Sequence, residues 1–140
     1  MDRAERAHAL AAIDPEAAIR LAESLSDGSL GDISIVSPPT LGMVMARAID
    51  GAQGETFNLG EVLVSEARVS VGGVPGWGMV LGRRRDHALA MAVVDASLEA
   101  GHRRRPAAER LLRRALAMAQ AHQNEEQQRV ADTRVHFETF

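Results

Sequence analysis

The chain has 140 residues, of which 46% are hydrophobic and 25% are charged, a composition typical of one globular domain. It has no cysteine, and all sixteen basic residues are arginine. Disulfides, thiolate metal sites, Schiff-base lysines and lysine-dependent phosphate loops are therefore excluded. The net charge of −3 and the scarcity of aromatic residues argue against binding to nucleic acid.

The sequence shows no targeting or membrane-spanning segment. The longest uncharged stretches, 33–46 and 69–82, are interrupted by proline or glycine. Both fall short of the about 20 apolar residues that a spanning helix needs. We therefore expect a cytoplasmic protein that makes no membrane contact.

The first quarter of the chain predicts two helices. Residues 3–12 are rich in alanine, and Asp14 and Pro15 then suit the N-cap and the first position of a second helix. Apolar residues recur at helical spacing up to Leu25, and the pair 27–28, Asp-Gly, marks the end.

The middle of the chain predicts β-structure. Prolines 38 and 39 are expected to end the first strand, and Gly60 with Glu61 to mark a bulge or a tight hairpin. The glycine-rich segment 72–78 predicts a turn. The expected strands are 33–36, 41–48, 55–71 and 79–81.

The last third predicts two helices and a final strand. Residues 84–100 are apolar on several faces, which indicates a buried helix. A longer helix is expected from about Pro106 to about Thr133, and because its second half is polar it should project from the domain. Val135 and Phe137 then alternate with polar residues, which predicts a short C-terminal strand in need of a partner.

These elements together predict an α+β fold over a single domain, residues 1–140. We expect a small, mostly antiparallel sheet of four or five strands with N-terminal helices. Two C-terminal helices, one of them long and projecting, and a short C-terminal strand complete the expected fold.

Three arginines, Arg83 to Arg85, follow Gly82 at the start of a predicted helix. A helix N-terminus carries partial positive charge and free N–H groups, so cations there oppose the helix dipole. An anionic ligand, phosphate or carboxylate, would relieve that conflict. The alternative is a solvated basic turn.

The sequence offers no metal site and no catalytic triad. The five histidines are scattered at spacings that no shared metal site uses, and no serine, histidine and acid stand at the spacing of a triad. The glycines at 76, 78 and 82 do not fit the dinucleotide-binding pattern.

Several polar residues interrupt the predicted apolar elements. Glu66 and Arg68 share a face of the longest predicted strand, with Glu61 nearby. They form either an exposed ion pair or a patch that contacts a partner or ligand. Asp95 lies within an otherwise apolar helix and must be hydrogen-bonded or paired. We expect it to anchor a loop rather than to act as a base.

A long block, 57–69 with the sequence FNLGEVLVSEARV, is followed by Gly76, Gly78, the pair 82–83 and His87. Together with a helical lead-in and the closing motif around residue 137, this pattern resembles the PhnG family. Members of that family are small subunits of the bacterial carbon–phosphorus lyase system for phosphonate breakdown. The chain departs from the family pattern at positions 84, 136 and 138, where it carries Arg, His and Glu.

The resemblance implies a subunit of a multi-subunit assembly. In that assembly, a phosphonate displaces adenine from MgATP. The reaction requires a nucleosidase-like partner subunit together with the PhnG-family subunit and other carbon–phosphorus lyase subunits. The product is a ribose 1-phosphonate 5-triphosphate. The resemblance implies no cofactor bound by this chain alone, with MgATP as the substrate of the assembled complex. A radical, iron–sulfur subunit cleaves the carbon–phosphorus bond later, and a chain without cysteine cannot be that subunit.

In that setting the sequence suggests which residues make contacts. The candidate contacts to an anion or a partner are Arg83, Arg84, Arg85 and His87. The candidate polar residues of the family pattern are Glu61, Glu66, Arg68 and Asp95. The strand expected to pair with a partner contains Val135 and Phe137, and no residue is expected to bind a metal. The alternative role is a scaffold that only stabilises the nucleosidase-like partner. The isolated chain is expected to self-associate through surfaces reserved for partners.

Overall fold

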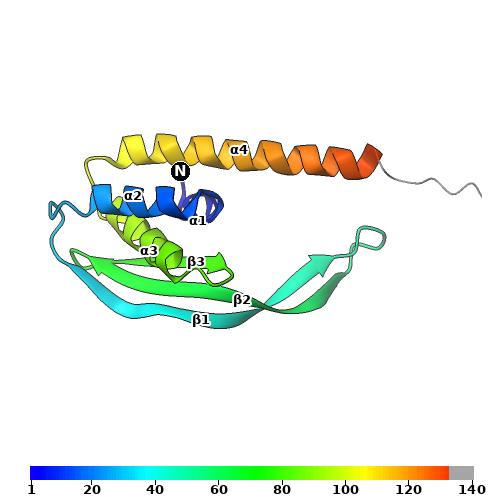
Figure 1. The fold of residues 1–140 in the computed structure, drawn as a ribbon, viewed down its shortest axis with the longest axis horizontal. Coiled ribbons are helices and arrows are strands. Elements are labelled where there is room, and N and C mark those ends of the chain that lie inside the picture. The colour runs from blue at the N-terminus through cyan, green and yellow to red at the C-terminus, as the bar shows by residue number, and fades with distance from the viewer. Residues whose placement is uncertain (133–140) are drawn as a thin grey trace, which may run out of the picture.

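The computed structural model describes residues 1–132, which form four layers (Figure 1). An antiparallel sheet lies at the bottom, helix α3 packs on one of its faces, α1 and α2 cover α3, and α4 crosses α1. The helices are α1 (Arg3–Ala12), α2 (Pro15–Leu25), α3 (Arg85–Glu99) and α4 (Arg105–Asp132), and the strands are β1 (Ile33–Ile49), β2 (Thr56–Val71) and β3 (Val74–Leu81).

The two N-terminal helices begin for different reasons. The side chain of Asp2 accepts a hydrogen bond from the backbone N–H of Glu5, whose side chain accepts one from Asp2 in return, so a capping box starts α1. Pro15 occupies the first position of α2, as predicted. Asp14 occupies the predicted N-cap position, but the capping hydrogen bond expected from its side chain is absent.

The sheet has three strands in the described part of the chain, in the order β1-β2-β3, and not the predicted four or five. The difference arises at Pro38 and Pro39, which were expected to end a strand but lie inside β1. Proline cannot donate to a strand ladder, but β1 is an edge strand and has one open side. The pairing with β2 shifts its register between Ser37 and Thr40, which accommodates both prolines.

The interruption predicted at Gly60 is a bulge and not a hairpin. Ala46 pairs with Gly60, whereas the next residue, Arg47, pairs with Asn58, so Leu59 is the extra residue of β2. The glycine-rich segment turns only at positions 72–73, where φ is positive. The rest of that segment belongs to β3.

The buried helix predicted at 84–100 is confirmed as α3, whose residues from His87 to Leu98 are buried except for the half-buried Leu89. It lies very close to β3. A Cβ atom on Gly76 would approach the Ala92 carbonyl oxygen to 2.2 Å, and one on Gly78 would approach that of Ala88 to 2.1 Å. The two glycines of β3 therefore allow the helix to pack directly on the backbone of the strand.

Two parts of the molecule extend beyond the layered body toward the same end (Figure 1). One is the second half of α4, which is polar and exposed as predicted. The other is the arm, defined here as residues 43–63, where β1 and β2 continue as a two-stranded ribbon past the end of β3. The predicted C-terminal strand lies outside the described residues.

Candidate functional site

The basic turn, defined here as residues Arg83–Arg85, is held in place by a buried serine. After β3 ends, Gly82 turns the chain with a φ of +86°. The Ser65 hydroxyl donates to the Gly82 carbonyl at 2.7 Å and accepts the backbone N–H of Arg84 at 2.7 Å. Because Ser65 is fully buried, these two bonds fix the turn to β2.

An open cavity of about 520 Å³ lies beside the basic turn. Its walls are Pro15, Ile19, Leu41 and residues 83–87, so α2, the part of β1 just before the arm, the basic turn and the start of α3 all contribute. Apolar side chains on one side and guanidinium groups on the other suit a ligand with an anionic end.

The guanidinium groups of the basic turn are unpaired. Across the described residues 1–132, none of the three makes a hydrogen bond or an ion pair through its side chain. The second arginine run behaves differently, because Arg103 lies 3.4 Å from Asp27 and Arg105 lies 2.9 Å from Glu109. Three exposed, uncompensated cations in one turn form a site that attracts anions.

The start of α3 adds to this attraction. Arg84 occupies the N-cap position, and its side chain makes no capping hydrogen bond. The N–H groups of the first helical turn therefore remain available, and the helix dipole favours negative charge there. Asp86 is the one acidic residue among the cavity walls.

His87 lines the same cavity but is only 1% exposed. Its Nε2 lies 2.7 Å from the carbonyl oxygen of Leu10, so Nε2 carries the hydrogen and donates it. Its Nδ1 is buried and has no partner among the described atoms. His87 thus joins α3 to α1, a role that sequence reasoning did not assign to it.

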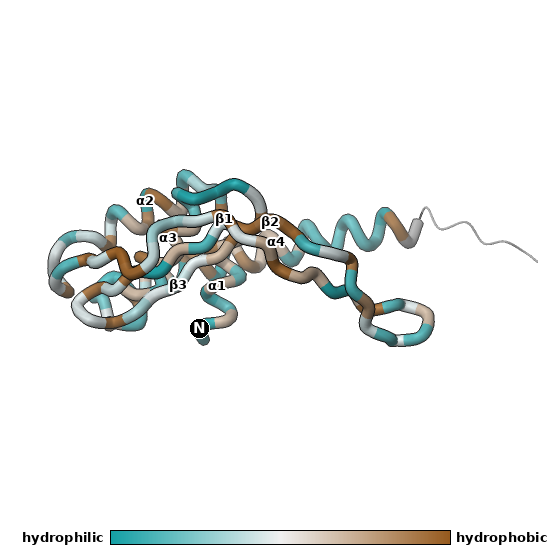
Figure 2. Tube along the Cα trace, turned by 90° about the horizontal axis from the view of Figure 1, so that it is seen from below, coloured by the Kyte–Doolittle hydropathy of each residue, from teal (hydrophilic) through white to brown (hydrophobic). Residues whose placement is uncertain are grey.

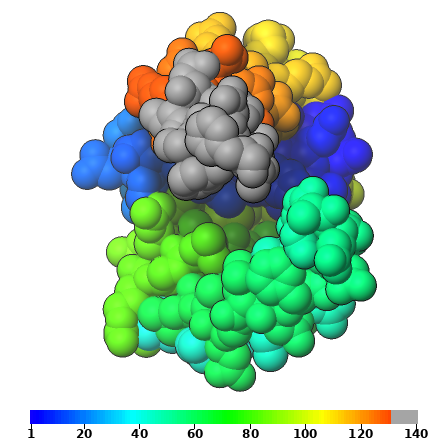
Figure 3. All heavy atoms as spheres, turned by 90° about the vertical axis from the view of Figure 1, so that its right-hand side faces the viewer, coloured from blue at the N-terminus to red at the C-terminus, as the bar shows by residue number. Residues whose placement is uncertain are grey.

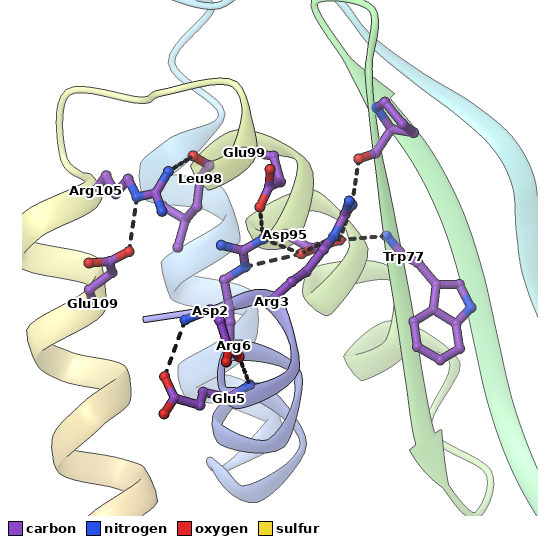
Figure 4. Close-up of polar contacts among 11 residues, drawn as sticks. Asp2, Arg3, Glu5, Arg6, Trp77, Asp95, Leu98, Glu99, Arg105 and Glu109 are labelled. Carbon is purple, nitrogen blue, oxygen red and sulfur yellow. Dashed lines mark hydrogen bonds and ion pairs between the residues drawn. The ribbon is translucent and has the colours of Figure 1, made fainter.

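Asp95 is the centre of a polar network that joins α1, α3 and β3 (Figure 4). Its carboxylate accepts hydrogen bonds from Arg3, from the fully buried Arg6 and from the backbone N–H of Trp77. Burial raises the pKa of Asp95, but the hydrogen bonds from Arg3 and Arg6 outweigh it and hold this pKa below its usual range. Asp95 is ten residues beyond Arg85 on α3, about 15 Å along the helix, so it is remote from the basic turn.

The remaining predicted residues lie elsewhere. Glu66 and Arg68 approach to 3.3 Å on the sheet face opposite α3, where Glu66 also accepts the indole N–H of Trp77 at 3.0 Å. Glu61 is exposed on the arm. Val135 and Phe137 lie outside the described residues. The structure therefore brings the basic-turn arginines and His87 together at one cavity, whose walls include neither Asp95 nor Glu66.

Two features relevant to function were not found from the sequence. Ser65, which anchors the basic turn, is one of many serines and carries no local signal. Arg3 and Arg6, which neutralise Asp95, are spaced three apart on one helical face. That spacing, together with an acid in an apolar helix, could have suggested the ion pairs.

The described residues hold no group of three metal-ligating side chains. Nor does any helix within residues 1–132 have the length and apolar character needed to cross a membrane.

Comparisons with known proteins place the whole chain in one group. The family model described as "Phosphonate metabolism protein PhnG" matches residues 1–140. A relative from Rhizobium meliloti (strain 1021), named alpha-D-ribose 1-methylphosphonate 5-triphosphate synthase subunit PhnG, is 37% identical over 112 residues. That alignment covers 78% of this chain and 70% of the relative.

Proposed function

The chain belongs to the PhnG family of phosphonate metabolism proteins, and from this premise we propose that it is a non-autonomous subunit of an alpha-D-ribose 1-methylphosphonate 5-triphosphate synthase. Its role is to support the step in which a phosphonate displaces adenine from MgATP. A phosphonate oxygen forms a bond to the ribose C1′ as the bond from C1′ to adenine breaks. The proton of the phosphonate monoanion ends on the departing adenine.

The observation that carries this proposal is the basic turn beside its cavity. Both reactants are anions, and bringing them together requires positive charge that no carboxylate already neutralises. Arg83, Arg84 and Arg85 meet that requirement because they are exposed and unpaired. We assign them the neutralisation of a phosphate or phosphonate group at a site completed by the nucleosidase-like partner.

A second candidate function is that of a scaffold that stabilises the partner and touches no substrate. It is favoured by the placement of Asp95 and Glu66, because both are engaged in contacts of their own and neither lines the cavity beside the basic turn. The arm and the exposed half of α4 also fit a chain whose main task is assembly.

The experiment that tests the proposal measures adenine release from ATP and methylphosphonate by the purified partner subunits, with and without this chain. We expect release only when the chain is present. Equal release in its absence would overturn the proposal.

Variants of the basic turn then separate the two roles. Replacing Arg83, Arg84 and Arg85 with alanine should leave assembly intact and raise the KM for ATP by about tenfold or more. The matched control replaces three other exposed, unpaired arginines on α4, at positions 110, 114 and 129, and should leave the KM unchanged. Full activity of the basic-turn variant would favour the scaffold.

A further inference from the structure

The arm leaves the body of the protein as a ribbon of only two strands. β3 ends where Leu81 pairs with Val64, and its last contact with β2 is the bond from the Gly82 N–H to the Leu63 carbonyl at 2.8 Å. Within residues 1–132, β1 and β2 pair beyond that point only with each other, from Met43 opposite Leu63 to the ends of both strands. A two-stranded ribbon is marginally stable by itself in water, so a ribbon of this length needs a further contact.

The arm contains hydrophobic positions on both of its strands (Figure 2), and large apolar side chains there are exposed. Met45 is 53% exposed and Leu59, the extra residue of the bulge, is 66% exposed. The arm residues that share this character are Met43, Met45, Ile49, Phe57 and Leu59. Three of them belong to β1 and two to β2, so apolar side chains are exposed along both strands of the ribbon. Exposed apolar side chains beside open strand edges mark a surface that another chain covers.

The solvent-accessible area of the molecule is larger than that of a compact protein of its size, which supports a partner that covers part of it. The chain exposes 9408 Å², whereas a compact protein of 15.0 kDa exposes about 7,000 Å². Even if residues 133–140 contributed the whole surface of an unfolded segment, about 1,500 Å², an excess of about 900 Å² remains. A standard stable interface buries about 800 Å² on each partner.

The charge of the arm selects among possible partners. Between residues 43 and 63 there are three acids, Asp50, Glu55 and Glu61, and one base, Arg47. Two copies of the same arm would therefore bring like net charge together, which disfavours self-pairing. A partner with an apolar strand and basic flanks would be complementary.

We propose that the arm is the docking surface for another subunit of the same synthase, which adds an extended, basic-flanked segment along the open edge of β2 at residues 56–62. This segment continues the line of β3, pairs with backbone groups that β3 leaves free, and covers the exposed side chains of the arm. Figure 3 views the molecule from the end where the arm projects, below α4. Only the identity of the partner, a subunit of the synthase, rests on the proposed function.

The test measures binding of full-length variants to the purified partner subunits, with unfolding temperature as the control for folding. Met45→Glu and Leu59→Glu should each weaken assembly at least about tenfold, because a charge is buried in the contact. The matched control is Met118→Glu on α4, whose side chain is 68% exposed, and it should change binding less than about twofold. Hydrogen exchange should show new protection at the amides of residues 56–62 in the complex.

Each other result overturns the inference. Arm variants that assemble like the unmodified chain, or amides 56–62 that stay unprotected, would show that the partner docks elsewhere. The isolated chain could instead form a dimer that the arm variants convert to a monomer while partner binding is unaffected. That result would show that a second copy of this chain covers the arm. Adenine release reports separately on the proposed function. If the reaction proceeds without this chain but the arm still docks in the complex, the proposed function fails and this inference stands.

Discussion

Arg6 and Asp95 meet in the interior of the protein, where the Nη2 atom of Arg6 lies 2.7 Å from Oδ1 of Asp95. The Arg6 side chain is 1% exposed and also donates to Glu99 at 2.6 Å. A buried guanidinium is tolerated only when carboxylates compensate its charge. This pair therefore holds α1 against α3 (Figure 4).

Replacing Asp95 with alanine should lower the free energy of unfolding by about 3 to 5 kcal/mol, because Arg6 would keep a buried charge with only Glu99 to compensate it. Urea unfolding at pH 7 measures the change. The control is Asp86→Ala, an exposed residue of the same helix, which should cost about 0.5 kcal/mol or less. Equal losses for both variants would contradict the assigned role of Asp95.

The same network predicts how stability depends on pH. Hydrogen bonds from Arg6 lower the pKa of Glu99, and the pKa of Asp95 is also lowered in the folded state. Since both carboxylates titrate near pH 4 in the unfolded chain, their contribution is present above about pH 5 and is lost as pH falls through the folded values. The difference in unfolding free energy between the unmodified chain and Asp95→Ala should therefore shrink between pH 5 and pH 3. A difference that stays constant would show that folding does not lower the pKa of Asp95.

Gly76→Ala should destabilise the fold by about 1 to 3 kcal/mol, since the added Cβ would collide with the Ala92 carbonyl oxygen of α3. Thermal unfolding should show a fall of several degrees, about 4 °C or more. Gly51→Ala is the control, because a Cβ there meets nothing within 4 Å. An unchanged unfolding temperature for Gly76→Ala would mean that the helix can move off the strand without cost.

Ser65→Ala should release the basic turn from β2. It removes the hydroxyl that bridges the Gly82 carbonyl and the Arg84 N–H, at a cost of about 1 to 3 kcal/mol. If the arginines act on substrate, the KM for ATP of the assembled synthase should rise together with this loss. Ser70→Ala is the control, because it removes a serine hydroxyl from the same strand. A loss of stability with no change in KM would favour the scaffold.

The sequence by itself determined the helices, the α+β class and the family. These features depend on local patterns: alanine-rich runs with helical apolar spacing, the nearly continuous apolar character of 85–99, and a long block of residues from 57 onward. The position of the basic turn at the start of α3 also followed from the sequence, because a turn glycine and the helix start stand beside it in the chain.

Only the tertiary structure decided which residues meet. Asp95 and Arg6 are 89 positions apart, and no local pattern relates them. The continuity of β1 through Pro38 and Pro39 depends on its place at the edge of the sheet, which is a property of the neighbouring strands. The contact of Glu66 with the Trp77 indole has the same origin, since it depends on the pairing of β2 with β3 and not on the local sequence.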